Sequence, residues 1–124
     1  MDCGLRNAVQ RSMSIQGENI GLLVESVIQK HLYLFAEARG MKTSYFREKG
    51  EVDIILHSID TLVPIEVKYQ SSISKSDFKT LVSFMEGEKI HKGILITRDL
   101  LDRQEIKGKD IRMIPAWLFL MVVS

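Results

Sequence analysis

The residues that decide the fold of this 124-residue chain are 62–97, which open with Leu-Val-Pro-Ile-Glu-Val-Lys-Tyr at 62–69 and close with Gly-Ile-Leu-Ile-Thr at 93–97. Both runs are apolar and rich in β-branched residues, as strands are. Between them, Ser74 followed three residues later by Asp77 is typical of a helix start, and apolar residues at helical spacing follow. A strand, a helix and a strand in this order form a crossover, so we expect the two strands to be parallel neighbours.

The preceding residues predict a long helix and two more strands. The helix is expected over residues 18–39, with Gly40 as its stop. Its apolar stripe at helical spacing consists of Ile20, Leu23, Val24, Val27, Ile28, His31 and Phe35. Strand-like runs at 43–47 and 51–57 are separated by a turn at Gly50, and such short connections favour antiparallel neighbours.

The two ends of the chain add smaller elements. Short helices are expected over residues 4–12 and 99–105, and a fifth strand over 111–114. The apolar run at 114–123 is about half the length needed to cross a bilayer. We therefore expect a last core element there, with a membrane or partner contact, such as a seam between two copies, as the alternative. Together these elements predict one α/β domain, residues 1–124, in which helices flank a mixed sheet.

Composition limits the function classes. The formal net charge of +1 does not indicate a nucleic-acid binder, so any affinity for DNA must come from local clusters of basic residues. The single cysteine, Cys3, excludes an internal disulfide and a zinc site built on cysteines, and it fits a reducing cytoplasm. The N-terminus lacks an apolar core, so no signal peptide is expected, and no phosphate-binding loop motif occurs.

Asp53, Glu66 and Lys68 are the residues that point most clearly to chemistry. Side chains alternate along a strand, so Glu66 and Lys68 share a face, and Asp53 sits beside Glu66 if the runs at 51–57 and 62–69 pair. Two close carboxylates repel each other, and Mg²⁺, which prefers oxygen ligands, removes that conflict. Such an ion polarises a phosphodiester and activates water, which Lys68 is placed to hold. The alternative is that the glutamate and the lysine form an ordinary cross-strand salt bridge on a solvent-exposed face of the sheet.

Five further residues extend this set. Glu25 lies at the margin of the apolar stripe, where it is either a third metal ligand or an ordinary boundary glutamate. Lys75 and Lys79 are one helical turn apart and could grip DNA phosphates beside the metal. Arg47 and Gln70 are also candidates for DNA contacts. For any single lysine a solubilising helix surface is the commoner explanation, and a plain strand end accounts equally well for Gln70.

Helical Glu25, then Val52-Asp53, then Glu66-Val67-Lys68 resemble the motif of the PD-(D/E)XK nuclease superfamily, with Val52 in place of the proline in its name. A closer resemblance covers nearly the whole chain. It is to the nuclease-like C-terminal domain of many archaeal and bacterial AAA+ ATPases, a family of unknown function in most catalogues. The segments that carry it are Asp2-x-Gly4-Leu5-Arg6-Asn7, Gly21-Leu22-Leu23-Val24-Glu25, Tyr45-Phe46-Arg47, Gly50-Glu51-Val52-Asp53, Pro64-Ile65-Glu66-Val67-Lys68 and Ile114-Pro115-Ala116-Trp117-Leu118-Phe119-Leu120. Ser26 stands where that family usually has Asn.

The resemblance implies a restriction-endonuclease-like core in the order helix-strand-strand-strand-helix-strand. It also implies a Mg²⁺ site at Glu25, Asp53 and Glu66, where Mn²⁺ can substitute, with Lys68 as a catalytic residue. The implied function is a Mg²⁺-dependent DNA endonuclease, of which a Holliday-junction resolvase is a variant, and a homodimer would suit it because nucleases of this fold often act in pairs.

The alternative function is a non-catalytic module that binds DNA or a partner protein and regulates an AAA+ ATPase in trans. It is motivated by the ATPase portion of such proteins, which would precede Asp2 and is missing from this sequence. The chain is then expected to be a stand-alone protein, one product of a split gene or a fragment.

Overall fold

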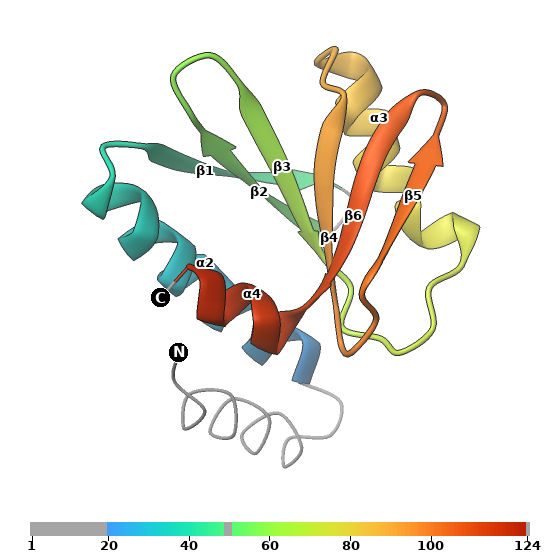
Figure 1. Ribbon diagram of the computed structural model, residues 1–124, viewed down its shortest axis with the longest axis horizontal. Helices are drawn as coiled ribbons and strands as arrows, with labels where there is room; N and C mark the ends of the chain where they lie inside the picture. Colours follow the sequence, from blue (N-terminus) through green and yellow to red (C-terminus); the bar gives the residue numbers. More distant parts are fainter. Residues whose placement is uncertain (1–19, 49–50, 124) are drawn as a thin grey trace.

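The computed structural model describes residues 20–48 and 51–123, together with their side chains except at 45–48 and 51–53 (Figure 1). Its elements, in chain order, are α2 (Ile20–Ala38), β1 (Lys42–Glu48), β2 (Glu51–His57), β3 (Leu62–Val67), the 3-10 helix η2 (Lys75–Phe78), α3 (Lys79–Gly87), β4 (Lys92–Thr97), β5 (Asp102–Ile106), β6 (Lys109–Pro115) and α4 (Ala116–Val122).

The described strands form one sheet in the order β1-β2-β3-β4-β6-β5. β1, β2 and β3 are antiparallel neighbours, whereas β3 pairs with β4, and β4 with β6, in parallel. The parallel crossover and the order helix-strand-strand-strand-helix-strand are therefore confirmed. This α/β arrangement, a mixed sheet flanked by helices, is consistent with a restriction-endonuclease-like core.

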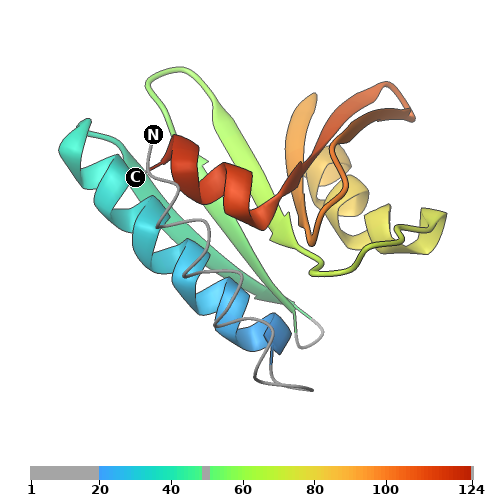
Figure 2. The ribbon, with the colours of Figure 1, turned by 60° about the horizontal axis from the view of Figure 1, so that its bottom comes forward.

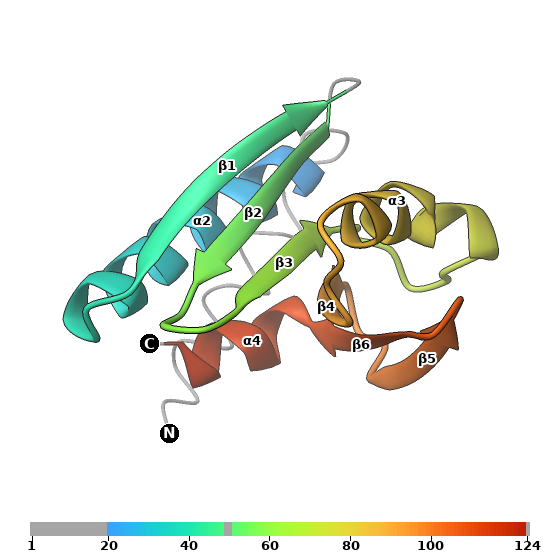
Figure 3. The same cartoon turned by 90° about the horizontal axis from the view of Figure 1, so that it is seen from above.

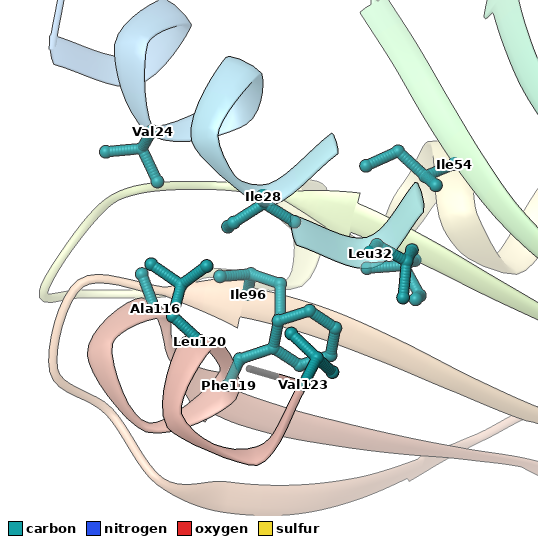
Figure 4. Packing of buried hydrophobic residues seen from close by; sticks show 10 residues of the cluster. Val24, Ile28, Leu32, Ile54, Ile96, Ala116, Phe119, Leu120 and Val123 are labelled. Carbon is teal, nitrogen blue, oxygen red and sulfur yellow. The ribbon is translucent and has the colours of Figure 1, made fainter. Parts of the chain in front are cut away.

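Helices cover both faces of the sheet, with α2 and α4 on one face and η2 and α3 on the other (Figures 2 and 3). On the first face, buried side chains of α2 and α4 meet Ile54 and Ile96 of the central strands (Figure 4), and Ile65 belongs to the same cluster. On the second face, Leu95 and Ile111 pack against α3. Because successive residues of a strand point to opposite faces, these two clusters fix the face to which each neighbouring side chain belongs.

The buried side of α2 differs from the expected stripe. Its fully buried residues recur every fourth position and are Val24, Ile28, Leu32 and Ala36. Leu32 therefore takes the place expected for His31, which is only half-buried. The cause is α4, which packs against α2 and shares its core cluster, a contact that the spacing within α2 does not reveal. Gly40, with a φ of 69°, ends the helix as expected.

The helix expected from Ser74 begins as η2 and continues as α3. The backbone N–H of Ser74 donates to Oδ2 of Asp77 at 2.8 Å, which confirms the expected start. The helix expected over residues 4–12 lies outside the described residues.

Residues 102–106 form strand β5, so the helix expected over 99–105 is wrong. A two-residue turn, Lys107 with a φ of 51° and Gly108 with a φ of 77°, folds β5 back onto β6. Positive φ at both central residues matches the twist of antiparallel strands, which is why such turns join hairpins. β6 lies between β4 and β5 and is longer than the strand expected over 111–114.

The C-terminal apolar run forms α4 and is a core element, as expected. Ala116, Phe119 and Leu120 of this helix are buried in the cluster that α4 shares with α2. Among the helices that the structure describes, none combines the length and the apolar character needed to cross a bilayer.

Candidate functional site

The register between β2 and β3 sets the backbone positions of the two strand acids. Ile54 and Ile65 are Cα partners in this antiparallel pair. Asp53 precedes Ile54 and Glu66 follows Ile65, so the same register, continued by one step, brings Asp53 opposite Glu66. The backbone of Asp53 pairs with that of Phe46 on its other side. The side chain of Asp53 lies outside the described residues, so its approach to Glu66 stays a prediction.

Glu66 is a buried acid in the middle of the sheet. Only 2% of its surface is exposed, and both carboxylate oxygens are shielded from solvent. It is the Cα partner of Leu95 across the parallel β3–β4 pair, and Leu95 packs beneath α3. The side chain of Glu66 therefore belongs to the α3 face. Removing a carboxylate from water is costly unless a cation or hydrogen-bond donors compensate it, so this position suits a metal ligand.

Lys68 lies on the same face as Glu66, because the two are separated by one residue along the extended chain. Its backbone N–H donates to the carbonyl oxygen of Ile96 at 2.8 Å, so pairing with β4 continues past the last residue of β3. Its side chain is half-buried. The structure thus places Glu66 and Lys68 on one face, while their chemical roles stay predictions.

Glu25 comes from a different layer of the fold than Glu66 and Lys68. It is half-buried on α2, where the side-chain amide of Gln29 donates to its Oε1 at 3.4 Å. Because α2 and α3 cover opposite faces, Glu25 and Glu66 approach any common ligand from different sides of the sheet. That the two acids share one metal ion therefore stays a prediction. Within the described residues, no three His, Cys, Asp or Glu side chains gather closely enough to hold a metal ion.

The carboxyl ends of β3 and β4 form a polar edge beside Lys68. The backbone N–H of Arg98 donates to the carbonyl oxygen of Gln70 at 3.1 Å, and the hydroxyl of Ser71 donates to Asp99 at 3.4 Å. Gln70, a predicted DNA contact, is therefore an exposed neighbour of Arg98. The sequence prediction did not include Arg98. Its position directly after a strand parallel to β3 is the signal that identifies it, because ligands of α/β sheets gather at such ends.

Tyr69 lies on the other face of this edge, packed against the cluster of α2 and α4. Burial raises the pKa of its hydroxyl above the ordinary value, while the nearby Arg98 lowers this pKa and Asp99 raises it. Tyr69 therefore keeps its proton at neutral pH.

The predicted DNA-binding lysines flank a groove. Lys75 lies on η2 and Lys79 is the first residue of α3; both are exposed and line a groove of about 760 Å³ between these helices and the β5–β6 turn. Lys107 lines the same groove from the turn. Sequence reasoning missed Lys107 because it placed a helix where the hairpin lies. The side chain of Arg47 lies outside the described residues.

Comparison with known proteins gives a family but no reaction. The model of the family described as "Domain of unknown function (DUF4143)" matches residues 20–119. A UPF0102 protein of Aliivibrio salmonicida (strain LFI1238) is 26% identical to this chain over 81 residues. That match covers 65% of this chain and 62% of the relative, so the chain spans less than two thirds of the relative's length. Neither description names an activity, so the reaction must be argued from the site.

Proposed function

This chain belongs to the DUF4143 family, and we propose that it is a Mg²⁺-dependent DNA endonuclease that hydrolyses phosphodiester bonds at the end of the β2–β3 pair. The observation that carries this proposal is the carboxylate of Glu66, shielded from solvent and two residues from Lys68 on the same face. The β2–β3 register, which leads to Asp53 opposite Glu66, supports it. Membership of the PD-(D/E)XK superfamily is part of the proposal.

The donor set of this region fits a hard divalent cation. Asp53 and Glu66 would hold Mg²⁺ through carboxylate oxygens, which are the ligands that this ion prefers, and Glu25 would add a third from the α2 side. Bound there, Mg²⁺ neutralises phosphate charge and lowers the pKa of water.

Lys68 supplies a positive charge, which the carboxylates lack. Its ammonium group is a compact positive charge on the face of Glu66, suited to holding the attacking water and to stabilising negative charge on the phosphate in the transition state. Gln70 and Arg98, at the carboxyl ends of β3 and β4, would orient the neighbouring phosphates.

A non-catalytic module that binds DNA or a partner and regulates an AAA+ ATPase is the second candidate. The observation that favours it is the placement of Glu25 on the helix layer opposite the face of Glu66. If Glu25 does not reach the end of the sheet, the ligand set loses one of its three acids, and a weaker metal site would result.

A cleavage assay on plasmid, branched and single-stranded DNA with Mg²⁺ or Mn²⁺ tests the first proposal. We expect the wild type to cut at least one substrate, and Asp53→Ala and Lys68→Ala to reduce the rate by about 10²-fold or more. Asp60→Ala, a change at an exposed residue of the β2–β3 turn, is the matched control and should leave the rate unchanged. The nuclease proposal would be refuted if the wild type cut none of these substrates or if Asp53→Ala kept full activity.

Calorimetry with Mn²⁺ on the wild type and on Asp53→Ala separates the two candidates. Metal binding that Asp53→Ala removes supports the nuclease site. DNA binding without metal binding or cleavage supports the non-catalytic module.

A further inference from the structure

The groove between η2, α3 and the β5–β6 turn gathers basic side chains from two separate parts of the chain. Lys75 comes from η2, Lys79 from the start of α3 and Lys107 from the hairpin turn, and all three are exposed. Figures 1 and 2 both show α3 beside this hairpin. For a chain whose net charge is only +1, three lysines around one groove of about 760 Å³ are a local concentration of positive charge.

We propose that this groove binds the phosphodiester backbone of DNA that flanks the cleavage site, with Lys75, Lys79 and Lys107 as its phosphate-binding residues. The inference rests on the proposed nuclease function and adds the path of the substrate. It assigns a role to Lys107 and to the β5–β6 hairpin that carries it.

The chemistry of the groove lining favours a polyanion over a protein partner. Phe78 and Val82 line it but are each only 5% exposed, and the half-buried Ile106 adds apolar surface at the end of β5. The polar part of the lining consists of three ammonium groups, the hydroxyls of Ser76, Thr80 and Ser83, and one carboxylate. Ammonium groups and hydroxyls are the side-chain donors with which proteins hold phosphate oxygens.

The single carboxylate in the lining does not cancel this charge. Glu86 lies 3.8 Å from the Nζ of Lys107, and the two side chains are 47% and 68% exposed. An ion pair so long and so open to water is weak, so Lys107 can exchange Glu86 for a phosphate. The positive end of the α3 dipole, which begins at Lys79, adds to the attraction for anions.

The groove lies on the side of the sheet where the proposed chemistry occurs. η2 and α3 cover the face to which Glu66 and Lys68 belong, and α3 packs over Leu95, the partner of Glu66. A DNA strand with one phosphate at Lys68 would therefore reach the groove without crossing the sheet.

DNA binding in EDTA, where no strand is cut, tests the inference by fluorescence polarisation with labelled single-stranded and duplex DNA. The test variant combines Lys75→Ala, Lys79→Ala and Lys107→Asn; asparagine is chosen because residue 107 has a φ of 51°, which it tolerates. The control variant combines Lys30→Ala, Lys42→Ala and Lys92→Ala, three exposed lysines outside the groove, and makes the same change in net charge. Lys79→Glu alone serves if the triple variant is poorly folded.

We expect the groove variant to bind DNA at least about 10-fold more weakly than the control, and the slope of log affinity against log salt to fall by about 2 to 3. Equal losses in the two variants, no DNA binding by the wild type, or binding of free nucleotides but not of DNA would overturn the inference. Groove-dependent binding by a wild type that never cuts DNA would uphold the groove and refute the nuclease. If the groove variant cuts DNA as fast as the wild type, the nuclease is upheld and the role of the groove is refuted.

Discussion

Glu66 and Leu95 are Cα partners across the parallel β3–β4 pair, and Leu95 packs beneath α3, so the carboxylate of Glu66 belongs to the α3 face. α2, which carries Glu25, packs on the opposite face. The two acids expected to share one metal ion therefore come from two layers of the molecule. The proposed chemistry therefore requires that Glu25 and Glu66 approach each other around the end of the β2–β3 pair.

The first prediction concerns the charge of Glu66. Glu66 is a buried carboxylate, and Glu66→Gln keeps its shape while removing the charge that would bind a metal ion. We expect the free energy of unfolding without metal to change by less than about 2 kcal/mol. Mn²⁺ affinity should fall at least about 10-fold. Urea unfolding and calorimetry measure the two quantities.

A large loss of stability in Glu66→Gln would contradict this prediction. If Glu66 is held as half of a buried structural ion pair, removing its charge leaves the partner cation uncompensated, at a cost of about 3 to 5 kcal/mol. A loss of that size in Glu66→Gln, with unchanged metal binding, would make the acid structural and remove the main support for the nuclease.

The sequence was sufficient for most of the fold because its central elements have strong local patterns. The runs at 62–69 and 93–97 are apolar and are separated by a capped helix, so their parallel pairing follows from the length and helical nature of the connection. The β5 strand, in contrast, is Asp-Arg-Gln-Glu-Ile, whose polar composition hides its strand character. Charged side chains suit an edge strand, since they oppose pairing with another chain.

Relations between site residues on the same strand could be predicted from the sequence more easily than contacts between different helices and strands. Alternation predicts that Glu66 and Lys68 share a face, and the packing of Val67 and Tyr69 against the cluster of α2 and α4 supports this. How the helices pack on the sheet decides on which face Glu25 lies. It also decides which basic residues gather beside η2 and α3. Lys107 reaches the groove only because the hairpin turn exists, and periodicity carries no information about such contacts.

The second prediction concerns the close approach of α3 to β4. A Cβ added at Gly93 would lie 2.8 Å from Sδ and 3.2 Å from Cε of the fully buried Met85. Overpacking costs about 1 to 3 kcal/mol, but Sδ and Cε are the flexible end of Met85 and can shift, so Gly93→Ala should lower the free energy of unfolding in urea by the lower part of that range, about 1 kcal/mol. In a background of Met85→Ala the cost should nearly vanish. Equal costs in both backgrounds would show that α3 does not pack on Gly93 in this way.

The third prediction tests the hairpin that sequence reasoning missed. Gly108 has a φ of 77° and nothing within 4 Å of an added Cβ, so Gly108→Ala is penalised by backbone conformation alone. We expect a loss of about 1 to 2 kcal/mol in thermal or urea unfolding. Gly87→Ala is the matched control, since an added Cβ is equally unhindered there and φ is not positive. It should be neutral or stabilising by up to about 1 kcal/mol, and similar losses in both variants would contradict the turn geometry.

The fourth prediction concerns the alkaline limit of stability, which Tyr69 helps to set. Burial raises the pKa of its hydroxyl above the ordinary value of 10.0, against the opposing effect of Arg98. In the unfolded chain the hydroxyl ionises near the ordinary value, whereas the folded protein holds the proton to higher pH. The unfolded state therefore binds fewer protons in this window, and stability falls as pH rises from about 10 through the raised pKa.

Tyr69→Phe removes the group that titrates and keeps the ring that packs against α2 and α4. The free energy of unfolding of this variant should decline less steeply than that of the wild type above about pH 10, and the two curves should run parallel below about pH 9. Arg98→Ala removes the charge that lowers the pKa of Tyr69, so phenolate absorbance should appear at higher pH than in the wild type. Identical pH profiles for the wild type and Tyr69→Phe would mean that the hydroxyl is as well solvated in the folded protein as in the unfolded chain, and the polar edge beside Lys68 would then be open to water on both faces of the sheet.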